Sequence, residues 1–399
     1  MAAVNTGSAR SVYVIGAGPA GLAAGAELVR QGLRPVLLER GAQVGSSWRA
    51  GYDRLHLHTV RALSGLPGFA IPRENGRWTP RDGMIDYLER YRVRNRLEVL
   101  CGTEAERIDA AASPGGDGVR WVIRTAAGER LPAWSVVVAT GHAHTPCLPD
   151  WPGAESYTGQ LLHARDYRNP APFGGLDVLV AGVGNSGAEI ATELSEGGAR
   201  RVSIAVRTPP HIVRREVAGW PAHLTGILVS RLPARLVDPV ARLQRRLTIP
   251  DLTPYGIPRP EDGLLTRVRR AGEAPLQDVG FVDAVRAGKV RPVAAVAGFE
   301  RDKVLLADGS ALRAAVVIAA TGYRRGLEKL VGHLGVLGDD GLPAVHGGRP
   351  AAPGLFFLGY TVSLRGMLRD IAADARRLGP AAGRDQRALR PRPAITTGR

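Results

Sequence analysis

The sequence predicts an α/β fold built from two units of similar design, with the second unit inserted into the first. A short apolar strand, a glycine-rich turn and a helix follow one another twice, with turns at Gly16 and Gly182. Later in each unit a strand runs into Ala-Thr-Gly. Strand, glycine turn and helix in this order are typical of Rossmann-like dinucleotide-binding domains. We therefore predict two such domains together with a helical insertion.

The domain limits follow from where these patterns begin and stop. We place the first domain at residues 1–156 and 322–380 and the second domain at residues 157–321. Residues 211–280 show no regular alternation of strands and helices and are predicted to form the helical insertion of the second domain. Residues 381–399 are rich in Pro, Gly and Arg, which predicts a disordered tail.

The first glycine turn has every feature of a dinucleotide site. Ser11–Ile15 is predicted to be a buried parallel strand, and a helix follows the turn. The first glycine permits the tight bend, the second lets the backbone approach a pyrophosphate, and the third lets the helix pack on the strand. The next strand, Pro35–Leu38, ends at Glu39, where a carboxylate accepts hydrogen bonds from a ribose. The predicted binding residues are Gly16, Gly18, Pro19, Ala20, Gly21, Glu39 and Arg40.

An acid at this position suits an unphosphorylated ribose, so the first site fits FAD or NAD better than NADP. The Gly-Pro-Ala-Gly form of the turn resembles flavoprotein sequences, which implies FAD. In this fold the chain that follows leads along the flavin, so Trp48 and His58 are predicted beside it. His58 either borders the flavin ring or is hydrogen-bonded within a polar loop. The strand Trp134–Ala139 runs into Thr140 and Gly141, which are predicted to close this half of the site.

The second glycine turn repeats the first but ends differently. Asp177–Ala181 is again a strand, and the strand Val202–Val206 leads to Arg207 in place of an acid. A guanidinium binds phosphate oxygens with two hydrogen bonds, so this turn fits NADP(H), unless Arg207 is one more surface arginine. The predicted binding residues are Gly182, Gly184, Asn185, Ser186, Gly187 and Arg207.

The chain then returns to the first domain. The strand Ala315–Ala320 precedes a second Thr-Gly pair, and the strand Leu355–Leu358 ends at Gly359. Many flavoproteins place an aspartate after such a glycine, but this sequence has Tyr360, so only backbone groups are assigned there. The residues predicted to bind cofactor in this part are Thr321, Gly322, Tyr323 and Gly359.

A motif between the two turns resembles the fingerprint of class B flavin monooxygenases, F-x-G-x-x-x-H-x-x-x-Y/F. Tyr157, Gly159, His163 and Tyr167 match it, with tyrosine in place of the leading phenylalanine. The resemblance implies that Tyr157 and His163 help to position NADP+ against the flavin. Within the class the chain is similar to the plant YUCCA enzymes, which convert indole-3-pyruvate to indole-3-acetate. Segments that carry this likeness include YDRLHLH, GVGNSGAE, LPARLVD, YGIPRP and RGML.

The resemblance implies an FAD- and NADPH-dependent monooxygenase that acts through a C4a-(hydro)peroxyflavin. Its substrates would be O2 and a small molecule, and we expect oxidative decarboxylation of an aromatic 2-oxo acid. Oxygenation of nitrogen or sulfur, a flavoprotein reductase that forms no oxygenated product, and a non-catalytic NADP sensor remain alternatives. No Ser/His/Asp or paired-carboxylate constellation is visible, and in such enzymes the cofactor performs the chemistry. Apart from His58, no catalytic residue is assigned.

Composition excludes several other classes. The net charge is +16, but only three lysines occur and the arginines are spread through every segment, so no nucleic-acid partner is expected. Cys101 and Cys147 give no CxxC pair, which argues against a disulfide reductase, and no metal site is predicted. No secretory signal or transmembrane segment is visible, so we expect a cytoplasmic protein. A homo-oligomer is compatible with the sequence.

The segment Gly226–Leu247 is apolar with recurrent arginines and predicts one or two amphipathic helices. These helices would form a wall of the substrate entrance or a patch at a membrane surface. Alternatively, they only pack on the second domain.

Overall fold

The first parallel sheet organises one half of the molecule. In the computed structural model, which describes residues 11–111 and 118–388, six strands form it in the order β22-β23-β7-β1-β2-β3. All of its pairs are parallel except β22 with β23. The strands are β1 Val12–Ile15, β2 Pro35–Glu39, β3 Glu98–Cys101, β7 Ser135–Val138, β22 Pro350–Ala352 and β23 Leu355–Phe357.

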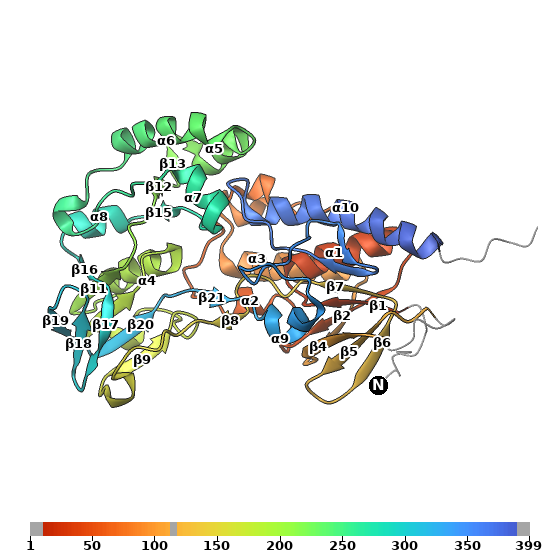
Figure 1. The fold of residues 1–399 in the computed structure, drawn as a ribbon. Helices are drawn as coiled ribbons and strands as arrows, with labels where there is room; N and C mark the ends of the chain where they lie inside the picture. Colours follow the sequence, from red (N-terminus) through yellow and green to blue (C-terminus); the bar gives the residue numbers. More distant parts are fainter. Residues whose placement is uncertain (1–10, 112–117, 389–399) are drawn as a thin grey trace, which may run out of the picture.

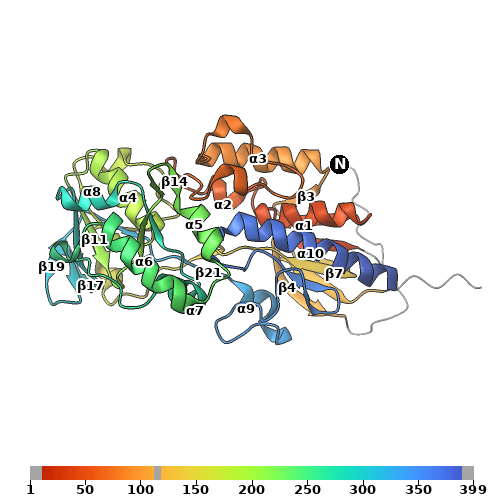
Figure 2. The same ribbon diagram turned by 90° about the horizontal axis from the view of Figure 1, so that it is seen from above.

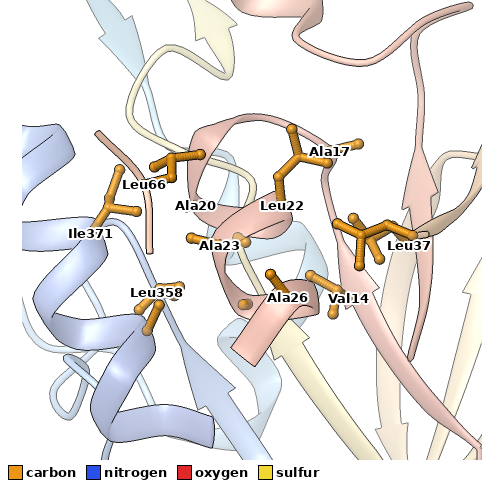
Figure 3. Packing of buried hydrophobic residues seen from close by; sticks show 14 of the residues in the cluster. Val14, Ala17, Ala20, Leu22, Ala23, Ala26, Leu37, Leu66, Leu358 and Ile371 are labelled. Carbon is orange, nitrogen blue, oxygen red and sulfur yellow. The ribbon is translucent and has the colours of Figure 1, made fainter. Parts of the chain in front are cut away.

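Helices cover one face of this sheet, with α1 (Pro19–Arg30) and α10 (Met367–Ala388) packed against each other and α3 (Arg81–Arg94) beside them. Alanine and glycine on α1 permit the close approach, and Figure 3 shows Ala20, Ala23 and Ala26 of α1 facing Leu358 and Ile371. The other face carries a three-stranded antiparallel sheet and helix α9, which are β4 Ala105–Ala110, β5 Trp121–Thr125, β6 Arg130–Ala133 and α9 Leu327–Val331.

Helix α10 corrects the predicted tail. Residues 381–388 were predicted to be disordered, but they continue α10 in spite of Pro380. Ala382 is fully buried, and Asp385 pairs with Arg120 at 2.5 Å, so these residues are held by packing and by an ion pair. The rest of the predicted tail, residues 389–399, lies outside the described residues.

The second parallel sheet organises the other half, in the order β16-β11-β10-β20-β9. Helices α4 and α8 pack on one face of this sheet, and an antiparallel meander of β17, β18 and β19 packs on the other. The parallel strands are β9 Gln160–His163, β10 Asp177–Ala181, β11 Arg201–Val206, β16 Val290–Ala294 and β20 Val316–Ala319. The remaining elements are α4 Asn185–Glu196, α8 Phe281–Arg286, β17 Val296–Glu300, β18 Lys303–Leu306 and β19 Ala311–Arg313.

Two short crossover strands join the halves. β8 (Thr145–Pro146) leaves the first half, β21 (Tyr323–Arg324) returns to it, and the two pair antiparallel. All strands of the second sheet lie between them in sequence, whereas β22 and β23 rejoin the first sheet. Strand pairing decides which elements share a sheet but not where a domain ends, so the limits at residues 156 and 322 stay predictions.

The segment after β11 contributes three helices to the outer edge of the molecule, as Figures 1 and 2 show (green). Helix α5 packs closely against the loop before α10. The contact is so close that a Cβ at Gly226 would overlap the carbonyl of Leu364. Helix α6 packs on α7. These helices and the short strands that precede and follow them are β12 Ile212–Arg214, β13 Glu216–Val217, β14 Trp220–Pro221, α5 Ala222–Val229, α6 Ala234–Thr248, α7 Leu264–Ala271 and β15 Leu276–Asp278.

Candidate active site

The two glycine turns have the same geometry. Gly16 has φ +102° and Gly182 has φ +114°, a region that side chains avoid. A Cβ on Gly16 would lie 2.7 Å from the carbonyl oxygen of Ala139, and a Cβ on Gly182 would lie 2.5 Å from that of Ala320. Each turn therefore lies directly over the end of the strand that runs into Ala-Thr-Gly.

The other glycines of each turn divide into a packed and an open position. A Cβ on Gly21 would overlap the carbonyl of Gly16, and a Cβ on Gly187 would overlap that of Gly182. Gly18 and Gly184, by contrast, face no heavy atom within 4 Å. Both cap their helices without a side-chain hydrogen bond, so the first N–H groups of α1 and α4 are available to an anion.

Glu39 stands at the end of β2, as predicted, but its carboxylate folds back onto the first turn. Oε2 accepts a hydrogen bond from Ala17 N at 2.8 Å, and Oε1 accepts from Gly41 N at 2.8 Å and Ser46 Oγ at 3.0 Å. Arg40 next to it donates to the carbonyl of His144 at 2.7 Å. Trp48, on α2 (Ser46–Arg49), packs against the core under the first sheet.

Arg207 follows β11 and lines a cavity of about 590 Å³ above the second turn. Gly182, Gly184 and Thr321 line the same cavity, so the structure brings these predicted residues together. The guanidinium of Arg207 makes no hydrogen bond or ion pair with any residue in the described part of the chain. A phosphate in this cavity would therefore meet an uncommitted cation.

A second cavity, of about 450 Å³, opens between the two halves. His58 and Ser363 line it from the first half, and Asn185 and Gln277 line it from the second. Asn185 is hydrogen-bonded to two other residues of the lining: its side chain donates to the carbonyl of Pro275 and accepts from Gln277 N at 2.7 Å. The remaining wall is mostly apolar and comes from α5 and α6. A wall of the substrate entrance was one of the alternatives predicted for this segment.

A buried carboxylate joins the halves at this cavity. Glu189 of α4 accepts a hydrogen bond from Tyr52 at 2.6 Å and contacts His58 Nε2 at 2.6 Å. Burial raises the pKa of Glu189, but the hydrogen bond and charge of His58 and the hydroxyl of Tyr52 outweigh it and lower the pKa below its usual value. Glu189 is therefore ionised and His58 Nε2 donates to it. His58, predicted to border the flavin ring or rest in a polar loop, is fixed by a partner far away in sequence.

The fingerprint residues support the backbone of the second half. A Cβ on Gly159 would lie 2.6 Å from the Tyr157 ring, which folds over it and donates to the carbonyl of Ala314 at 2.7 Å. His163 Nδ1 accepts from Arg165 N, so Nε2 is the nitrogen that donates, at 3.0 Å, to the carbonyl of Gly322. The histidine thus fixes the second Thr-Gly turn, with its ring against Tyr323 at a centroid distance of 5.0 Å.

The first Thr-Gly pair meets the last strand. Thr140 and Tyr360 share a hydrogen bond of 2.8 Å, and Gly141 has φ +78°. Gly359 lies against α1, where a Cβ would come within 2.8 Å of the Cβ of Ala20. Tyr360 is buried in the core beside Phe357, where its hydroxyl is occupied by Thr140.

His142 is a residue of this region that sequence reasoning missed. Its Nε2 is buried without a partner among the described residues, and its ring lies 5.9 Å from that of Tyr360. Burial, helped by the charge of Arg325, lowers the pKa of His142 to about 4, so the ring is neutral near pH 7. Its position directly after Thr140 and Gly141 was the only available signal.

The comparisons with known proteins agree with this geometry. The model of the flavin-binding monooxygenase-like family matches residues 9–328. The chain belongs to this family. It is a flavin-dependent monooxygenase of a family that uses FAD and NADPH, and it acts on small molecules with O2.

Among relatives, rice (Oryza sativa subsp. japonica) indole-3-pyruvate monooxygenase YUCCA1 is 34% identical over 78% of this chain and 76% of its own. The probable indole-3-pyruvate monooxygenase YUCCA3 of Arabidopsis thaliana is 32% identical over 87% and 81%. The flavin-containing monooxygenase from Stenotrophomonas maltophilia superposes with a TM-score of 0.68 at 27% identity over 93% of this chain and 99% of that one.

Cyclohexanone monooxygenase from Rhodococcus sp. Phi1, solved with NADP+ bound, shares the fold at a TM-score of 0.69 and 20% identity, over 95% of this chain and 85% of that one. Within residues 11–111 and 118–388, no helix combines the length and apolar character needed to cross a membrane. The same residues contain no cluster of three or more His, Cys, Asp or Glu side chains arranged to hold a metal ion.

Proposed function

We propose that this monooxygenase holds FAD at the first glycine turn and NADPH at the second, and that it oxidatively decarboxylates an aromatic 2-oxo acid such as indole-3-pyruvate. The open positions at Gly18 and Gly184 fit the two pyrophosphates, since each leaves room for a close approach to backbone N–H groups. The unpaired Arg207 fits the 2′-phosphate of NADPH.

One observation carries the choice of substrate: an arginine with an unpartnered Nε in a cavity whose wall is mostly apolar. Arg245 of α6 lines the cavity between the halves, and its Nε is buried without a partner among the described residues. The Nη1 of Arg245 lies 3.4 Å from His211 Nδ1. Burial and the charges of Arg259, Arg242, Arg246 and Arg267 lower the pKa of Arg245. A carboxylate here would give Arg245 the acidic partner that it lacks among the described residues.

The apolar wall fits the rest of such a substrate. Val229, Leu232, Val237 and Val240 line the same cavity, and the YUCCA relatives carry indole-3-pyruvate in their names. A ring in this wall and a carboxylate at Arg245 describe an aromatic 2-oxo acid. A neutral amine or sulfide would leave the arginine uncompensated.

The chain's own groups would orient the reactants and exclude water. The redox chemistry, which passes electrons from NADPH to O2, would be supplied by bound FAD. His58, whose Nε2 is fixed on Glu189, presents Nδ1 as its remaining nitrogen and is the group best placed to accept or donate a proton at the cavity wall. Overall, a 2-oxo acid, O2, NADPH and a proton would give the acid one carbon shorter, CO2, water and NADP+.

The test offers the purified enzyme NADPH with indole-3-pyruvate, phenylpyruvate, an amine or a sulfide, and identifies products by mass spectrometry. We expect the shortened acids, labelled when the oxygen gas is labelled. In Arg245→Gln, the KM for the 2-oxo acids should rise about ten- to hundredfold, because a charged hydrogen bond is lost, with little change in kcat. Arg246→Gln, next to it but exposed, is the matched control. If only N- or S-oxides formed, the proposed substrate class would be wrong.

A further inference from the structure

Helix α6 turns its most apolar face to solvent. Leu236, Val240, Leu243 and Leu247 follow one another at helical spacing and form one stripe, here called the leucine stripe. Their exposed fractions are 58%, 65%, 60% and 79%. Large apolar side chains grouped in this way on a protein surface mark a contact site. Leu228 of α5 and Leu232 of the connecting loop, 68% and 46% exposed, extend the same surface.

The opposite face of α6 is the one that holds it to the molecule. Val237 and Asp238 are buried there, and the Asp238 carboxylate accepts hydrogen bonds from Leu265 N at 2.7 Å and Thr266 Oγ1 at 2.6 Å. These bonds fix α6 on the first turn of α7. The leucine stripe is therefore exposed by a defined attachment of the helix, which leaves it pointing outward in a fixed direction.

Arginines border the leucine stripe on one side. Arg235, Arg242 and Arg246 each directly precede a stripe residue in the sequence, so they lie along the same border. All three are exposed, and none forms an ion pair with a residue described in the structure. The only acid between residues 222 and 250 is Asp238, which is consumed by the contact with α7. The surface thus combines exposed apolar groups with uncompensated positive charge.

We propose that α5 and α6 dock the enzyme on an anionic lipid surface, with the leucine stripe in the interfacial layer and its arginines on the lipid phosphates. A helix with an apolar face and a cationic border binds in the plane of such an interface. A second copy of this chain is the less suitable occupant, because it would bring two sets of unpaired arginines together.

The docked orientation would bear directly on the cavity between the halves. Leu232, Leu236 and Val240 also line that cavity, so its mouth opens at the same surface. Docking would place this mouth against the lipid, so that the aromatic ring of a substrate held at the interface would enter the cavity without crossing bulk water.

The test measures co-sedimentation of the full-length enzyme with vesicles. We expect binding to vesicles that contain phosphatidylglycerol, weak binding to phosphatidylcholine alone, and weakening as salt is raised. Arg235→Gln with Arg246→Gln should lower the partition coefficient roughly thirtyfold, at about a fivefold loss per arginine. Leu243→Ser with Leu247→Ser, neither of which lines the cavity, should lower it at least about tenfold.

Matched controls carry the same changes elsewhere. Arg73→Gln with Arg130→Gln removes two exposed arginines of the first half, and Val29→Ser with Val93→Ser removes two exposed valines there. Binding should stay within about twofold of wild type in both. If the leucine variant does not fold, as judged by circular dichroism, the arginine pair decides the test alone.

Three results would overturn the proposal. Equal binding to neutral and anionic vesicles would remove the role of charge. An equal loss in the arginine controls would mean that the overall basic charge, and not this surface, drives binding. A wild-type dimer in light scattering that becomes a monomer in the leucine variant, without vesicle binding, would make the leucine stripe an interface between copies.

Discussion

The two glycine turns of this molecule share one backbone and differ in the residue that faces them. Gly16 and Gly182 both adopt positive φ over the end of an Ala-Thr-Gly strand, and Gly18 and Gly184 both leave open space at a helix N-terminus. Sequence identity between the turns is low outside the glycines. The shared geometry is therefore set by positions where a side chain has no room.

The facing residues behave in opposite ways. Glu39 is engaged with Ala17, Gly41 and Ser46, so it stabilises the first turn itself. Arg207 has no partner in the described chain and stands free in its cavity. Glu39 therefore pre-organises the first site, whereas Arg207 at the second site stays available for a ligand. We expect substitutions at the two positions to separate folding from binding.

The largest expected effect tests the shared part of the comparison. Gly21→Ala and Gly187→Ala each place a Cβ on a backbone carbonyl within the turn, which no side-chain movement relieves. Each should destabilise the fold by more than about 4 kcal/mol, because helix and strand must separate. Thermal unfolding and soluble yield measure this. A melting temperature within a few degrees of wild type for either variant would contradict the packed role of the third glycine.

The next effect distinguishes the two sites. Gly18→Ala and Gly184→Ala add a Cβ to open space, so both proteins should fold with an almost unchanged melting temperature in the absence of cofactor. Gly18→Ala should lose bound flavin and its yellow colour. Gly184→Ala should keep the colour and show a KM for NADPH raised at least about tenfold. Loss of flavin from Gly184→Ala but not from Gly18→Ala would reverse the assignment of the cofactors.

A smaller effect tests the contrast between the facing residues. Arg207→Ala should raise the KM for NADPH by about ten- to hundredfold and leave the KM for NADH nearly unchanged, since only the phosphate contact is lost. Stability should not change, because the side chain has no partner to lose. Glu39→Gln should instead lower stability by about 1–3 kcal/mol, because the amide keeps one acceptor oxygen and turns an NH2 donor toward the other backbone N–H. Arg201→Gln, an exposed arginine on β11, is the control. A cofactor preference unchanged in Arg207→Ala would show that its free position has no role in binding.

The smallest effect concerns pH and the first site. The folded pKa of His142 is about 4, below the ordinary value of 6.5. Below about pH 6.5 the imidazole is protonated in the unfolded chain but stays neutral in the folded protein. Stability therefore decreases as the pH is lowered from about 6.5 to about 4. Between about pH 6.5 and pH 5 this contribution should amount to about 1–2 kcal/mol. Urea unfolding at both pH values should show a smaller difference in His142→Gln; an identical difference would assign the acid sensitivity to other groups.

Local patterns predicted the turns well because their causes are local. Gly16, Gly18 and Gly21 act within a few residues of one another, so their spacing contains the geometry. The pairing of β1 with β2 and of β10 with β11 agrees with the predicted order of strand, helix and strand. The prediction of a disordered tail was wrong for residues 381–388 for the opposite reason. Ala382 is buried in the core and Asp385 pairs with Arg120, which lies far away in the chain.

The contacts between the two halves could not be predicted from the sequence either. Glu189 lies 131 residues from His58 and 137 from Tyr52, and no pattern in either segment points to the other. The helical prediction for 226–247 was also incomplete: amphipathic spacing indicates that one face is buried, whereas the apolar face of α6 is exposed and the face with Asp238 packs. Periodicity shows that a helix has two faces but not which of them meets the protein.

The return of the chain to its first sheet sets an order of events during synthesis. Strand β7 ends at Val138 and needs β23, which begins at Leu355, as its parallel neighbour, and α1 needs α10, which follows later still. All five strands of the second sheet leave the ribosome before β23 does. The second half can therefore fold while the first waits with one strand edge and the apolar side of α1 uncovered. Such contacts, distant in sequence, form late, and a chaperone that shields α1 would act in this interval.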